Sequence, residues 1–130
     1  MIFALAVTSF LVIYSLYKGK TIELKTIVIE TDKIAKPCQF VFISDVHIGT
    51  QSVEYLNMLL DKIKALNPDY VCIGGDLVDS SAVTINQLKA FKTLSMPVYF
   101  VTGNHEYYLK QSTQLLNQLK DVNIQWINND

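Results

Sequence analysis

The feature that most constrains the fold of this 130-residue chain is the alternation of short apolar runs with amphipathic segments. The runs "QFVFIS", "YVCIGG" and "MPVYFVTG" have the length and composition of buried strands, and the first is apolar enough to be covered on both faces. Between them, residues 53–66 and about 83–94 place apolar side chains at helical spacing. Strands that alternate with helices predict βαβ units and a largely parallel sheet. We therefore expect an α/β domain over residues 21–130.

Further elements complete the expected domain. The segment "TIELKTIVIE", residues 21–30, is rich in β-branched side chains and predicts a strand. Residues 109–121, "LKQSTQLLNQLKD", predict a helix, and "NIQWIN" at 123–128 predicts a short last strand.

The N-terminus differs from the rest of the chain. Residues 1–17, "MIFALAVTSFLVIYSLY", contain no charged side chain, and "KGK" follows directly. A helix of this length spans roughly 25 Å, the short end of what a bilayer core requires. Because no basic residue precedes the run and no small-x-small site follows it, we favour a transmembrane anchor at 1–18 over a cleaved signal peptide or a buried helix. The lysines that follow predict a single-pass protein of the cell membrane with the rest of the chain in the cytoplasm.

Charge and cysteine content exclude several functions. The chain has 11 basic and 12 acidic residues, and without a basic stripe it offers nothing to attract nucleic acid. Cys38 and Cys72 match no zinc-site spacing, and no disulfide framework is expected.

Each of the three apolar runs passes directly into polar residues: "SDVH", "GGDLVD" and "GNHE". The carboxyl ends of parallel strands open into one crevice, so these clusters are expected to converge. Side chains at i and i+2 of an extended chain project to the same side, which would aim Asp45 and His47 at one point. A carboxylate beside an imidazole suits Mn, Fe or Zn better than Mg. For this pair alone, a turn or a helix N-cap is the competing interpretation.

The other two clusters carry the same ambiguity. Asp76 follows Gly75 at the end of a strand, and Asp79 is either a cap for the next helix or a support for a metal ligand. Asn104 and His105 offer an amide oxygen and an imidazole, although Gly-Asn also commonly forms a turn with a helix cap.

Together the clusters form a pattern: Asp-x-His, 27 residues, Gly-Asp-x-x-Asp, 23 residues, Gly-Asn-His-Glu. This pattern resembles the calcineurin-like metallophosphoesterases, and the apolar N-terminus with "GNHEYY" is similar to their membrane-anchored bacterial branch. The resemblance implies the N-terminal half of a four-layer α/β/β/α sandwich. It also implies a hydrolase that cleaves a phosphate mono- or diester through a dinuclear metal centre and a metal-bound hydroxide.

The resemblance assigns roles to individual residues. Asp45 and His47 would bind the first of two divalent metal ions, Asp76 would bridge both, and Asn104 would bind the second. His105 would lie beside the phosphate, stabilising charge or protonating the leaving oxygen. Four residues would support these: Asp79, Glu106, Gly75 and Gly103.

One part of the family pattern is absent. The family continues with Gly-His and Gly-His-x-His, whereas His47 and His105 are the only histidines in this sequence. We therefore expect the membrane anchor plus the N-terminal half of an enzyme, with apolar sheet surface left exposed. The alternative is a non-catalytic, membrane-tethered metal-binding or interaction remnant. For the enzyme, the anchor favours a lipid-linked or membrane-proximal phosphate ester as substrate.

Overall fold

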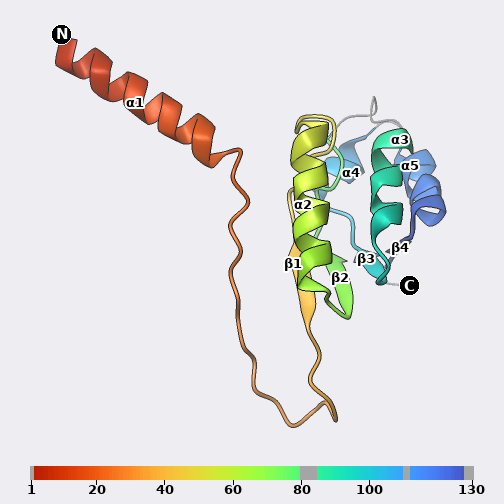
Figure 1. The fold of residues 1–130 in the computed structure, drawn as a ribbon. Helices are drawn as coiled ribbons and strands as arrows, with labels where there is room; N and C mark the ends of the chain where they lie inside the picture. Colours follow the sequence, from red (N-terminus) through yellow and green to blue (C-terminus); the bar gives the residue numbers. More distant parts are fainter. Residues whose placement is uncertain (1, 80–84, 110–111, 128–130) are drawn as a thin grey trace. The chain divides into compact units, whose positions relative to one another are not determined.

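The computed structural model describes residues 2–79, 85–109 and 112–127, in two compact units, Met1–Lys33 and Ile34–Asp130. In the first unit, helix α1 (Ile2–Lys18) contains the apolar run (Figure 1). Of the helices in the described part of the chain, none combines the length and the apolar character needed to cross a membrane. The anchor at residues 1–18 therefore stays a prediction.

The prediction of a strand at residues 21–30 is wrong. The backbone there forms neither helix nor strand, and the side chains of Ile27, Val28 and Ile29 are exposed. β-branched residues favour an extended backbone, but a strand also needs a neighbour to complete its hydrogen bonds. In the described structure no strand pairs with this segment.

The second unit contains the predicted parallel sheet. Its four strands lie in the order β1-β2-β3-β4, and every neighbouring pair is parallel. The strands are β1 (Phe40–Ile43), β2 (Tyr70–Ile73), β3 (Val98–Phe100) and β4 (Ile124–Trp126). The mixed α/β class is thus confirmed.

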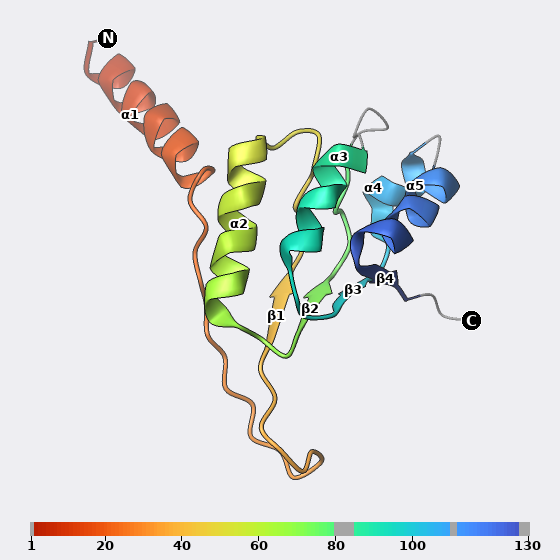
Figure 2. The same cartoon turned by 45° about the vertical axis from the view of Figure 1, so that its right-hand side comes forward.

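Helices connect the strands, and α2, α3 and α5 lie along one face of the sheet (Figures 1 and 2). Helix α2 has the predicted bounds because Ser52 accepts the Tyr55 N–H at its start and Asn67 ends it in the left-handed conformation. Residues 83–84 of the second expected helix, and 110–111 of the third, lie outside the described residues. The helices are α2 (Val53–Leu66), α3 (Ile85–Leu88) with η1 (Lys89–Thr93), α4 (Asn104–Tyr108), and α5 (Ser112–Leu119) with η2 (Lys120–Val122).

The two faces of the sheet differ in burial. Alternate residues such as Val71, Val98 and Ile124 are buried on the face that the helices cover. On the opposite face, Phe40 is 46% and Phe42 63% exposed. The expectation that the first strand is covered on both faces is therefore wrong for β1, whereas the expected exposed apolar sheet surface is present.

An aromatic ladder runs across this exposed face. The Phe40 ring stacks on Tyr70 at 5.3 Å between centroids, and Tyr70 meets Tyr99 edge to face at 6.0 Å. These pairs link β1, β2 and β3 through side chains as well as through backbone hydrogen bonds.

Candidate metal centre and active site

The backbone turns sharply where β1 and β2 end. Asp45, His47 and Asp76 all have positive φ values, of 56°, 50° and 52°. This left-handed conformation is uncommon for residues other than glycine and concentrates at functional sites. The expected extended geometry for Asp45 and His47 is therefore wrong. Their side chains still meet, with Asp45 Oδ1 3.9 Å from His47 Nε2, because two left-handed residues flank the buried Val46.

The segments that follow β1 and β2 are hydrogen-bonded to each other. The Asp45 N–H donates to the Gly75 carbonyl at 3.2 Å, and the His47 N–H donates to the Asp76 carbonyl at 3.0 Å. These backbone bonds fix the spacing of Asp45, His47 and Asp76 without using their side chains.

Two glycines allow the third cluster to approach. Gly75 has φ of 99°, and a Cβ placed on it would lie 2.8 Å from Gly103 Cα. A Cβ on Gly103 would lie 2.2 Å from Asp76 Oδ1. Neither position has room for a side chain, so the backbones after β2 and β3 can touch here only through glycine.

Glu106 holds these segments together. Its side chain is buried, at 1% exposure. One carboxylate oxygen accepts the Val78 N–H at 2.8 Å, and the other accepts those of Asp76 and Gly103 at 3.0 and 2.8 Å. A buried carboxylate requires such compensation, and hydrogen bonds to a charged acceptor are the stronger kind.

Asp76 caps the short helix α4 from a different segment. Its Oδ1 atom accepts the His105 backbone N–H at 2.9 Å. The N-cap residue of α4 is Gly103, which has no side chain to provide this acceptor. Among the described residues, no hydrogen bond engages the second oxygen of Asp76, which leaves it available to a ligand.

The two histidines and Asp79 form one cluster. The rings of His47 and His105 meet edge to face at 4.7 Å. Asp79 Oδ1 contacts Nδ1 of His105 and lies 3.5 Å from Nδ1 of His47, while Thr50 Oγ1 donates to Asp79 Oδ2 at 2.5 Å. The Thr50 hydrogen bond, together with the hydrogen bond from His105 and the charge of the two histidines, holds the pKa of the Asp79 carboxyl below its ordinary value against the opposing effect of burial.

Two overlapping sets of side chains could hold a metal ion. In each of Asp45–His47–Asp76 and His47–Asp79–His105, one donor atom per residue lies within 4.8 Å of the others. Asp79 is already engaged by Thr50 and His105, so the first set is the better candidate for ligands. Its two carboxylates and one imidazole suit a first-row divalent ion.

The remaining predicted site residues lie close by in the chain. Asn104 is the exposed first residue of α4, directly after the Gly103 that packs on Gly75. Whether Asp79 caps the next helix lies outside the described residues, because residues 80–84, between it and α3 (Ile85–Leu88), are not described. Its place beside both histidines matches the alternative in which it supports them.

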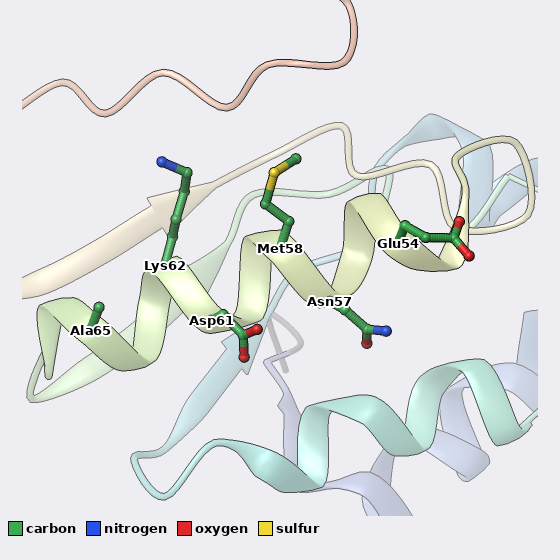
Figure 3. Close-up of a pocket in the computed structure, with 6 residues that line it drawn as sticks. All are labelled: Glu54, Asn57, Met58, Asp61, Lys62 and Ala65. Carbon is green, nitrogen blue, oxygen red and sulfur yellow. The ribbon is translucent and has the colours of Figure 1, made fainter.

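One hollow on the surface, of about 600 Å³, has no residue of this cluster in its lining. Figure 3 shows that its lining comes from one face of α2: Glu54, Asn57, Met58, Asp61, Lys62 and Ala65. These positions are one helical turn apart and contain none of the predicted ligands. A second hollow, of about 460 Å³, has Val46 and Ile48 in its lining, the residues on either side of His47.

Thr50 is the residue that the sequence interpretation missed. It lies three positions after His47, where the expected i and i+2 geometry gave no reason to look. The available signal was Gly49, whose φ of 110° makes the turn that brings the Thr50 hydroxyl to Asp79.

Comparison with known proteins identifies a family and several relatives. The family model described as Calcineurin-like phosphoesterase matches residues 38–130. An uncharacterized metallophosphoesterase of Campylobacter jejuni is 32% identical over 81% of this chain and 30% of its own length. Two further relatives are named transmembrane protein with metallophosphoesterase domain. The one from Bos taurus is 33% identical over 71% of this chain and 22% of its own length. The one from Danio rerio is 29% identical over 98% of this chain and 31% of its own length. This chain thus spans less than a third of the length of each of these relatives.

Proposed function

We propose, from the premise that this chain belongs to the calcineurin-like phosphoesterase family, that its strand-end cluster is part of an active site that hydrolyses a phosphate mono- or diester. The observation that carries the proposal is the convergence of Asp45, His47, Asp76 and His105 from the segments that follow three neighbouring strands. Three of the four have left-handed backbone conformations, which are uncommon for residues other than glycine and concentrate at functional sites.

Asp45, His47, Asp76 and Asn104 would hold two divalent ions, Mn, Fe or Zn rather than Mg. The donor atoms suit this use, because His47 Nε2 lies 3.9 Å from Asp45 Oδ1 and, among the described residues, no hydrogen bond engages the second carboxylate oxygen of Asp76. When bound, such ions supply Lewis-acid stabilisation of the phosphoryl oxygens and an activated water. Asp76 would be the bridging ligand, because its carbonyl accepts the His47 N–H and its carboxylate accepts the His105 N–H.

His105 would protonate the leaving oxygen. A carboxylate can only accept hydrogen bonds, so the contact with Asp79 places a proton on His105 Nδ1 and leaves Nε2 for the substrate. In hydrolysis, the phosphorus–oxygen bond to the leaving group breaks as one to water forms, and the departing oxygen takes the Nε2 proton. Asp79 stabilises the positively charged ring that this transfer requires.

The membrane context is a further part of the proposal. Helix α1 would anchor a cytoplasmic active site to the cell membrane, favouring a membrane-proximal or lipid-linked phosphate ester. The uncharged run at residues 1–17 and the names of the Bos taurus and Danio rerio relatives support it. Extraction of membranes at alkaline pH tests the anchor, because a peripheral protein would be released.

A second sheet would cover the aromatic ladder, as in a four-layer sandwich.

The activity test uses the protein as its gene encodes it. With Mn²⁺, we expect hydrolysis of 4-nitrophenyl phosphate or bis(4-nitrophenyl) phosphate, and none after chelation. His105→Ala should lower kcat at least about 100-fold while bound manganese stays near the wild-type level. Tyr108→Ala, which truncates an exposed side chain on the same helix, is the matched control. The absence of hydrolysis of both esters by metal-loaded wild-type protein would overturn the proposed function.

A further inference from the structure

The Asp79 carboxylate is engaged on both sides. Oδ2 accepts the Thr50 hydroxyl at 2.5 Å, and Oδ1 contacts His105 Nδ1 and lies 3.5 Å from His47 Nδ1. The terminal torsion of an aspartate is broad, so a carboxylate held at one oxygen can rotate away from its partner. The bond from Thr50 removes that freedom and keeps Oδ1 directed at His105.

Thr50 is itself fixed by backbone contacts. It follows Gly49, and its N–H donates to the His47 carbonyl at 3.0 Å. The Asp79 N–H donates to the Ile48 carbonyl at 3.1 Å. The segments that contain Thr50 and Asp79 are therefore paired through their backbones as well as through the side-chain hydrogen bond. These backbone bonds hold the Thr50 and Asp79 backbones at the spacing that the side-chain hydrogen bond between them requires.

We propose that Thr50 is a positioning residue that orients Asp79 and, through it, the ring of His105 for proton transfer to the leaving oxygen. This rests on the proposed function, because it assumes that His105 is the proton donor. Thr50 itself touches neither the substrate nor the predicted metal ligands through its hydroxyl. Its effect should therefore depend on how much the leaving group needs a proton.

The test compares two esters that differ only in the leaving group. Phenol leaves much faster when its oxygen is protonated, whereas 4-nitrophenol leaves readily as the unprotonated phenolate. Thr50→Val removes the hydroxyl with little change in shape and should lower kcat about tenfold for the phenyl ester and much less for the 4-nitrophenyl ester. Thr50→Ser keeps the hydroxyl and should restore most of the rate. Thr93→Val is the matched control, since it removes a hydroxyl that donates to the Ala90 carbonyl outside the site.

Two further readouts separate the possible failures. Bound manganese should be unchanged in Thr50→Val, and the ¹⁵N shift of His105 Nδ1 should move in Thr50→Val but not in Thr93→Val, whether or not an ester is hydrolysed. An equal loss with both esters, or an unmoved Nδ1 signal, would overturn the positioning role while leaving the phosphoesterase proposal intact. If Thr50→Val does not fold, Thr50→Ala against Thr50→Ser gives the same comparison. An inactive wild type with a moved Nδ1 signal would instead contradict the proposed function.

Discussion

Glu106 Oε1 accepts the backbone N–H of Val78 at 2.8 Å, although the two residues lie 28 positions apart. The same carboxylate accepts two more N–H groups through its other oxygen. One buried side chain thus satisfies the backbone N–H of the predicted metal ligand Asp76, that of Val78 two residues later, and that of Gly103 after β3. Glu106 is in this sense the residue on which the shape of the site depends.

Glu106→Gln should destabilise the fold. Either orientation of the amide places an N–H₂ group against a backbone N–H, and each buried donor left without an acceptor costs about 1–3 kcal/mol. We expect the free energy of unfolding, measured in urea, to fall by at least about 2 kcal/mol. Glu30→Gln, an exposed site outside the helices and strands, is the control. A change no larger than that of the control would show that the carboxylate is not needed.

Gly75→Ala should disrupt the same region through its backbone. The residue has φ of 99°, and its Cβ would lie 2.8 Å from Gly103 Cα, so strain and a steric clash act together. We expect a lower unfolding temperature and weaker manganese binding, because Asp76 moves with the backbone. Gly19→Ala, in the segment that follows α1, should change neither. Retention of wild-type manganese affinity by Gly75→Ala would contradict the close approach.

Asp76→Asn should weaken metal binding more than it weakens the fold. The amide oxygen can still accept the His105 N–H, so the cap on α4 can persist, whereas the negative charge that would bridge the two proposed ions is lost. We expect both ions to be lost together in a metal titration followed by mass spectrometry. Retention of one ion at wild-type affinity would show that Asp76 does not bridge.

Cys72 and Cys38 should differ in reactivity. Burial raises the pKa of the Cys72 thiol, so less of it is thiolate at neutral pH, whereas Cys38 is exposed. We expect iodoacetamide to modify Cys38 first, and the rate at Cys72 to rise as the pH is increased toward its pKa. Mass spectrometry of timed samples measures both. Equal rates at neutral pH would contradict the placement of Cys72 between β1 and β3.

Local patterns predicted the helices and strands of the second unit well. Helix α2 matches its predicted bounds because its apolar spacing, its Ser52 cap and its end at Asn67 are all local signals. The expected strand at residues 21–30 failed because pairing depends on a neighbour that the local pattern does not contain.

The candidate site was predicted in composition but not in geometry. The clusters were found from their positions after the apolar runs. The left-handed backbone at Asp45 and His47, and the bond from Thr50 to Asp79, depend on contacts between segments about 30 residues apart. Asp and His adopt the left-handed conformation more often than most residues other than glycine, but still uncommonly, so the local pattern favoured an extended strand end.

Each strand of the described sheet after β1 pairs with the strand that precedes it in the chain. The ribosome therefore makes β1 and β2, and the residues Asp45 and Asp76 that follow them, before it makes β3. The carboxylate that hydrogen-bonds to the Asp76 and Gly103 N–H groups belongs to Glu106, which is translated only after β3. Since a domain generally folds as a unit, the candidate site depends on a residue that is synthesised after its predicted ligands Asp45, His47 and Asp76.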